Sequence, residues 1–236
     1  MQAVVPAAGE GTRLRPLTED RPKGLVDVAG QPLLAHVFES LVDLGIEEIV
    51  TVVGYRGEDI IEHFGESYRG VPLSYVWQEA PKGVADALLQ ARDAVDGDVV
   101  LYNGDNLFDA DLERVLEVHR ARNPGATLLV DSVDEEAARR TGVVVRDDDG
   151  TVTGFVEKPA DPPSNTVLTG FFVLSPAVFD AASHSSPSER GELELADALD
   201  VLANEGHAIE LVPLEGWRMN VNTPADLEQA DAYLRQ

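Results

Sequence analysis

The feature that most constrains the fold of this chain is the alternation of short apolar runs with helical patterns over its first 132 residues. Strand-like runs lie at 2–6, 48–53, 73–78, 98–102 and 126–132. Helical spacing lies between them at 32–45, 57–65, 83–95 and 111–122. Strands that alternate with helices of about ten residues form right-handed βαβ units. The pattern therefore predicts an α/β fold, with a Rossmann-like, mainly parallel sheet and helices on both of its faces.

The second half of the chain has a different pattern. The segment "VVVRDDDGTVTGFVE" is typical of a β-hairpin, because two β-rich runs flank an Asp-Asp-Gly turn. We also expect strands at 166–174, 208–213 and 217–221, and helices at 176–183, 193–205 and 224–235. The chain shows no internal repeat, and its linker-like stretches, 159–165 and 183–191, are short. We predict a single domain over residues 1–236.

Two polar segments, "PAAGEGTR" and "NGDN", follow predicted strands, and ligands of such folds bind at the carboxyl ends of strands. Glycines in the first segment let the backbone approach a ligand, and their N–H groups can bind phosphate oxygens. The segment is not a P-loop, since no Gly-Lys-Ser/Thr follows, and Leu14 stands where the dinucleotide fingerprint needs its third glycine. Arg13 and Lys23 can instead converge on a polyphosphate.

The charge balance bears on the partners and on the source. The chain has 18 Lys and Arg residues against 43 Asp and Glu residues, a formal net charge of −25. This argues against nucleic acid and anionic membranes as partners, and it fits the cytoplasm of a halophilic archaeon, where the Debye length falls to about 3 Å. The absence of cysteine excludes thiol catalysis, and no apolar run resembles a signal peptide or a membrane span. We expect a cytoplasmic protein with small-molecule partners, and leave open whether it is a homo-oligomer.

The segment "GEGTRLRPLTEDRPK" resembles the signature of the sugar-1-phosphate nucleotidylyltransferases, Gly-x-Gly-Thr-Arg-Leu-x-Pro-Leu-Thr followed by Pro-Lys. The similarity continues along nearly the whole chain and points to the glucose-1-phosphate thymidylyl- and uridylyltransferase branch. It implies the GT-A-like nucleotide-diphospho-sugar transferase fold. It also implies transfer of a nucleotidyl group from UTP or dTTP to a sugar 1-phosphate, above all glucose 1-phosphate, with release of pyrophosphate. Longer members append a β-helix or a dimerisation tail, and we expect neither here.

The resemblance also implies where the nucleotide binds. The phosphates would contact the N-terminal loop together with Arg13 and Lys23, and Gln78 and Gly83 would contact the base. A carboxamide carries a donor and an acceptor, which suits uracil or thymine. The loop residues implied are Ala7, Ala8, Gly9, Gly11 and Thr12.

The metal position is where the sequence departs from the family. Asp105 follows an apolar strand and matches the family's ligand for Mg²⁺, the expected cofactor. The second ligand position, in "GWRMNVNTPADL", holds Asn220 where most members have Asp, and Asn222 replaces a glycine. The related N-acetylglucosamine-1-phosphate uridylyltransferases also use Asn there. We therefore expect activity with weaker metal binding.

On the sugar side, Gly142 would contact the sugar through its backbone, Glu157 would accept hydrogen bonds from hydroxyls, and Lys158 would neutralise the sugar phosphate. Thr169 and Gly170 would line the pocket, with Glu192 as a further contact. The residues expected to be catalytic are Arg13, Lys23, Asp105 and Lys158. A phosphate monoester is already anionic, so no general base is needed, and the five histidines receive no role.

Three alternatives stay open. The residues do not distinguish UTP from dTTP. The sugar could be N-acetylglucosamine 1-phosphate or mannose 1-phosphate. The neutral Asn220 also raises a function of another class, a regulator that binds a nucleotide sugar without turnover.

Overall fold

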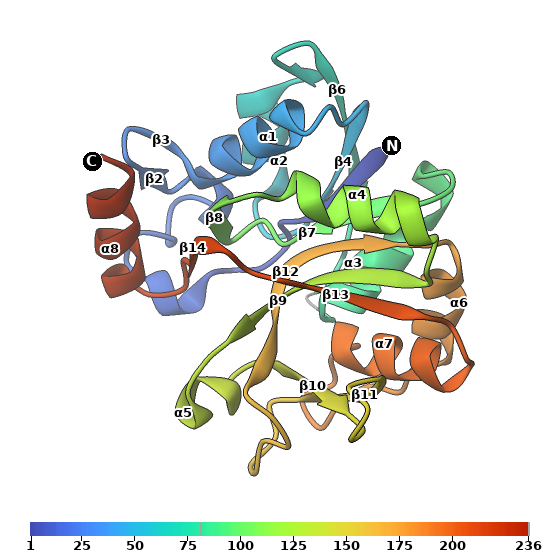
Figure 1. Ribbon diagram of the computed structural model, residues 1–236. Coiled ribbons are helices and arrows are strands. Elements are labelled where there is room, and N and C mark those ends of the chain that lie inside the picture. Colours follow the sequence, from blue (N-terminus) through green and yellow to red (C-terminus); the bar gives the residue numbers. More distant parts are fainter. Residues whose placement is uncertain (81, 236) are drawn as a thin grey trace.

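The computed structural model describes residues 1–80 and 82–235 (Figure 1). Their main feature is a sheet of ten strands in the order β11-β10-β12-β7-β1-β4-β6-β5, in which β9 pairs with β12 and β13 pairs with β9. The strands are β1 (Gln2–Pro6), β4 (Glu48–Val53), β5 (Ser67–Tyr68), β6 (Val71–Trp77), β7 (Val99–Tyr102), β9 (Ala126–Ser132), β10 (Gly142–Arg146), β11 (Val152–Glu157), β12 (Thr166–Leu174) and β13 (Ile209–Pro213).

The N-terminal part of the sheet is parallel. β1 lies between β4 and β7, with Val4 opposite Val50 on one side and Leu101 on the other, and β4 continues to β6 in the same direction. These strands read as nearly continuous runs of Val, Ile and Leu because helices cover both of their faces. Their carboxyl ends meet at one edge, where the predicted ligand-binding segments lie.

The C-terminal part adds antiparallel pairs to the same sheet. β12 runs antiparallel to both β7 and β9, and β10 and β11 form the predicted hairpin. β13 runs parallel to β9. The sheet is therefore mixed, and its βαβ half agrees with the predicted Rossmann-like fold.

Helices pack on both faces of the sheet and form two cores. One core includes α1 (Leu33–Asp43), α2 (Gly57–Phe64) and α4 (Glu113–Arg122), and the other includes α3 (Val84–Gln90), α6 (Ala177–His184) and α7 (Leu195–Asn204). The short α5 (Glu135–Ala138) and the turns η1 (Thr12–Leu14), η2 (Lys23–Leu25) and η3 (Arg92–Ala94) complete this part. α3 is shorter than the helix predicted over 83–95 because the chain tightens into η3.

Two small ribbons lie outside the main sheet. β2 (Asp27–Val28) pairs with β3 (Gln31–Pro32), and β8 (Asn106–Ala110) pairs with β14 (Gly216–Asn220), which places Asn106 opposite Asn220. α8 (Pro224–Leu234) packs beside β14 and β2, away from the sheet (Figure 1). None of the described helices is long and apolar enough to cross a membrane.

Candidate active site

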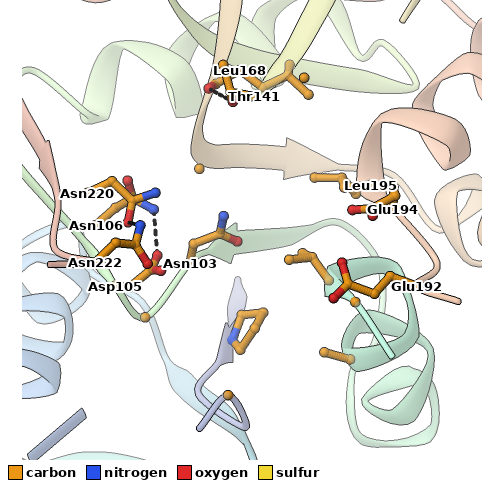
Figure 2. A pocket seen from close by; sticks show the side chains of 18 of the residues that line it. Asn103, Asp105, Asn106, Thr141, Leu168, Glu192, Glu194, Leu195, Asn220 and Asn222 are labelled. Carbon is orange, nitrogen blue, oxygen red and sulfur yellow. Dashed lines mark hydrogen bonds between the residues drawn. The ribbon is translucent and has the colours of Figure 1, made fainter. Parts of the chain in front are cut away.

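A cavity of about 1020 Å³ opens at the carboxyl ends of the parallel strands. Figure 2 shows part of its wall, with Glu192 and Glu194 on one side. On the other side lies an amide-rich cluster made of Asn103, Asp105, Asn106, Asn220 and Asn222. All the residues assigned from the sequence line this one cavity: Ala7, Ala8, Gly9, Gly11, Thr12, Arg13, Lys23, Gln78, Gly83, Asp105, Gly142, Glu157, Lys158, Thr169, Gly170, Glu192 and Asn220.

The N-terminal loop is held against Lys23. Gly11 has a φ of 62°, and a Cβ there would lie 3.0 Å from the Cβ of Lys23 and 3.1 Å from Cγ2 of Thr18. The buried Thr18 hydroxyl donates a hydrogen bond to the Gly11 carbonyl at 2.8 Å. Glycine is needed at this position because the backbone is left-handed and the neighbouring side chains leave no room.

Arg13 and Lys23 converge, as the sequence predicts, and one neutral side chain joins them. Asn222 Oδ1 accepts hydrogen bonds from Arg13 Nη2 at 2.8 Å and from Lys23 Nζ at 2.9 Å. Lys23 Nζ also lies 2.7 Å from Asp105 Oδ2 in an ion pair. The backbone N–H of Asn222 is in turn held by Asp226 in the capping box of α8. In the sequence, Asn222 stands out only as a replaced glycine, and the structure shows its contacts with the two cations.

The amide-rich cluster of Figure 2 surrounds Asp105. Asp105 Oδ1 accepts a hydrogen bond from Asn106 Nδ2 at 3.0 Å, and Asn222 Nδ2 donates to Asn220 Oδ1. Within residues 1–80 and 82–235, the buried Oδ1 atoms of Asn103 and Asn106 have no hydrogen-bond partner. The same residues contain no group of three or more His, Cys, Asp or Glu side chains that could hold a metal ion. The cluster therefore offers one carboxylate and several amide oxygens.

Gln78 lies where β6 ends and is nearly buried, with 6% of its surface exposed. Its backbone N–H donates to the Val53 carbonyl at 2.8 Å, and its side-chain Nε2 donates to Asp86 Oδ2 at 2.6 Å and to the Gly83 carbonyl at 3.2 Å. Gly83 has a φ of 95°, and a Cβ there would lie 2.3 Å from the Leu193 carbonyl oxygen. Glycine is required here because the segment before α7 passes directly against it.

On the predicted sugar side of the cavity, the structure brings Glu157 and Lys158 together. Lys158 Nζ lies 3.0 Å from Glu157 Oε1. Arg190 joins them, at 3.7 Å from Glu157 and 2.6 Å from Glu194. Burial raises the pKa of Glu157, and the charges of Lys158 and Arg190 oppose that rise. Arg190 was not assigned from the sequence, although it lies two residues before Glu192, which was expected to contact the sugar.

The remaining predicted residues contribute mainly backbone. A Cβ on Gly142 would lie 3.2 Å from Glu157 Oε2, so the chain passes close to that carboxylate. The Thr169 hydroxyl is buried and donates its proton to the Leu129 carbonyl at 2.7 Å. The Gly170 carbonyl accepts from the Asn103 N–H at 2.9 Å.

Comparison with known proteins gives one consistent result. The family model described as nucleotidyl transferase matches residues 2–236. The UTP–glucose-1-phosphate uridylyltransferase AglF of Haloferax volcanii is 48% identical over 236 residues, which are 100% of this chain and 97% of that relative. The glucose-1-phosphate thymidylyltransferase of Streptomyces griseus is 36% identical over 229 residues, 96% of this chain but 64% of the relative.

Among solved structures, the crystal structure of a Bacillus anthracis protein provisionally assigned as a glucose-1-phosphate thymidylyltransferase superposes with a TM-score of 0.89. It is 29% identical, and the match covers 100% of this chain and 96% of the other. This agreement confirms the fold expected from the resemblance. The chain belongs to the nucleotidyl transferase family and is a nucleotidyltransferase.

Proposed function

We propose that this enzyme transfers the nucleotidyl group of UTP or dTTP to glucose 1-phosphate and releases pyrophosphate. The names of the Haloferax and Streptomyces relatives support glucose 1-phosphate as the acceptor. The observation that carries the proposal is that two separate pairs of cations line one cavity. Arg13 and Lys23 come from the loop after β1, whereas Lys158 and Arg190 come from the end of β11 and the segment before α7.

The chemistry needs no covalent intermediate. An oxygen of the sugar phosphate attacks the α-phosphorus in line, a new P–O bond forms, and the bond to the β-phosphate oxygen breaks as pyrophosphate leaves. Catalysis is then positioning together with stabilisation of charge. Arg13 and Lys23 would stabilise the leaving pyrophosphate, and Lys158 and Arg190 would hold the attacking phosphate. The nucleophile is already an anion, so no proton has to be removed.

Asp105 and Asn220 are the residues that would hold Mg²⁺. The donors gathered there are oxygens, namely one carboxylate and amide carbonyls, and the partnerless Oδ1 atoms of Asn103 and Asn106 lie in the same cluster of the described chain. Such a set suits a hard cation that completes its shell with phosphate oxygens and water. A bound Mg²⁺ supplies neutralisation of the charge on the reacting phosphates. Lys23 meanwhile keeps Asp105 oriented through its ion pair.

The test is pyrophosphate release in molar KCl with Mg²⁺, crossing UTP, dTTP, CTP, GTP and ATP with the 1-phosphates of glucose, N-acetylglucosamine and mannose. We expect release with UTP or dTTP and glucose 1-phosphate. Preference for another sugar would correct the acceptor. No release with any pair, while nucleotide binding by calorimetry is intact, would contradict the proposal and favour a binding protein with a neutral Asn220.

A further inference from the structure

The side-chain amide of Gln78 has one orientation set by its partners. Its Nε2 faces Asp86 Oδ2 at 2.6 Å and the Gly83 carbonyl at 3.2 Å. A carboxylate and a backbone carbonyl can only accept hydrogen bonds. The opposite orientation would place Oε1 against two acceptors, so both N–H donors of Gln78 are committed to the protein.

The atom of this side chain that remains for a ligand is therefore Oε1, an acceptor. Gln78 lines the cavity, and the donor that the sequence prediction also allowed for the base is already in use. Uracil and thymine carry a hydrogen on N3 and can donate it to such an acceptor. Cytosine has a lone pair on N3, so an acceptor held against N3 faces a second acceptor, which leaves a buried group unpaired at a cost in free energy.

We propose that Asp86 is a positioning residue that sets base selectivity, because it holds Gln78 with its acceptor toward the base. The inference rests on the proposed function, in which Gln78 contacts the base. Asp86 is buried behind Gln78, in the first turn of α3, and is not among the described residues that line the cavity. It therefore acts through Gln78 and not on the substrate.

A purely structural role explains this carboxylate less well. Acidic residues in the first turn of a helix do stabilise the helix N-terminus. However, the N-cap of α3 is Gly83, which forms no side-chain cap, and the carboxylate of Asp86 bonds the Gln78 amide. A carboxylate with 9% exposure costs free energy to bury, and a neutral amide offsets only part of that cost. Orientation of Gln78 accounts for its presence.

The test is the variant D86N, whose side-chain amide can donate to or accept from Gln78, so that only the Gly83 carbonyl still favours the wild-type orientation. The matched control is D93N, which makes the same change at an exposed residue of η3. For each protein we would measure kcat/KM with UTP, dTTP and CTP, and the Kd of UTP and CTP by calorimetry without sugar phosphate. Should D86N fail to fold, D86S replaces it.

We expect the wild type and D93N to prefer UTP and dTTP over CTP, and D86N to lose about tenfold of that preference, the effect of one hydrogen bond to a charged group. A folded D86N with the wild-type ratio would overturn the inference. So would a wild type that binds CTP as tightly as UTP. A wild type that releases no pyrophosphate, yet binds UTP more tightly than CTP in a manner that D86N weakens, would refute the proposed function and leave the role of Asp86 standing.

Discussion

Four of the six described Lys and Arg side chains that line the cavity form two pairs, and these pairs are compensated in different ways. The loop cations, Arg13 and Lys23, share the neutral acceptor Asn222, and among residues 1–80 and 82–235 only Lys23 of the two forms an ion pair with a carboxylate, that of Asp105. The acid-bound cations, Lys158 and Arg190, contact several carboxylates: Glu157, Glu192 and Glu194. Two positive charges thus face one negative charge in the first group and three in the second.

The unequal compensation would allow an acidic protein to bind two different anions in one cavity. The loop cations keep an excess of positive charge, which suits a triphosphate and the pyrophosphate that leaves. The acid-bound cations have no such excess, so in the proposed function a sugar phosphate would bind there through hydrogen-bond geometry. The glutamates beside them can also accept hydrogen bonds from sugar hydroxyls. Four measurements test whether the two pairs of cations differ in this way.

The largest effect is expected for K23M. Loss of the lysine removes one of the loop cations and the partner of Asp105, so turnover should fall by about a thousandfold or more, as for other phosphate clamps. The measurement is kcat/KM for the nucleotide, with the melting temperature as a check on folding. K82M, at an exposed lysine, is the control. Near-normal turnover in K23M would remove Lys23 from the site.

A smaller loss with a different signature is expected for K158M and R190M. Each removes one acid-bound cation, so KM for the sugar 1-phosphate should rise by about ten- to a hundredfold while KM for the nucleotide stays near normal. Steady-state kinetics with each substrate varied in turn would show the separation. If both variants raised KM for the nucleotide instead, the two pairs would not serve different anions.

Asn222 tests whether neutrality of the shared acceptor matters. N222D keeps an acceptor between Arg13 and Lys23 but adds a negative charge, whereas N222G removes the acceptor. We expect N222D to weaken pyrophosphate binding by about tenfold or more and N222G to weaken it by less. Calorimetry at two KCl concentrations measures both, with N204G on α7 as the control. Equal losses of pyrophosphate affinity in N222D and N222G would show that the orientation of the two cations matters and the added charge does not.

The smallest effect concerns stability at Glu157. Burial raises its pKa, so the folded protein binds this proton more tightly than the unfolded chain does. Stability is therefore lost as the pH rises from the ordinary value of 4.5 toward the raised pKa. E157Q removes that loss. The melting temperature of E157Q minus that of the wild type should therefore rise by up to a few degrees between about pH 4 and pH 8. The exposed E189Q is the control, and a difference that does not vary with pH would contradict the assignment.

Much of the fold could be predicted because its signals are local. The strands predicted at 48–53, 126–132 and 166–174 coincide with β4, β9 and β12, since each is an apolar, β-branched run. β8 was not predicted, because "NLFDA" is short and takes its partner, β14, from the other end of the chain. Ribbons of this kind leave little trace in local periodicity.

For the site too, residues in a local motif could be predicted, whereas contacts between distant segments could not. The N-terminal loop could be predicted because its residues are contiguous and form a motif. Asn222 could not, since it meets Arg13 across 209 residues of sequence. Asp86 lies in the helix predicted over 83–95, and Arg190 lies in the linker-like stretch 183–191. Their contacts, however, depend on how α3 and the segment before α7 pack. Roles that arise from packing between distant segments are not visible in one sequence.

The β8–β14 ribbon has a consequence for biosynthesis. Asp105 is made early, but the strand that pairs with β8 and carries Asn220 is the last of the described strands to leave the ribosome. The Asp105 carbonyl also accepts a hydrogen bond from the N–H of Val221, the residue that follows β14. A nascent chain can therefore complete the parallel strands and the N-terminal loop before Asp105 and Asn220 are brought together. Asp105 and Asn220, the proposed metal-binding residues, are therefore brought together only after every strand of the main sheet has been synthesised.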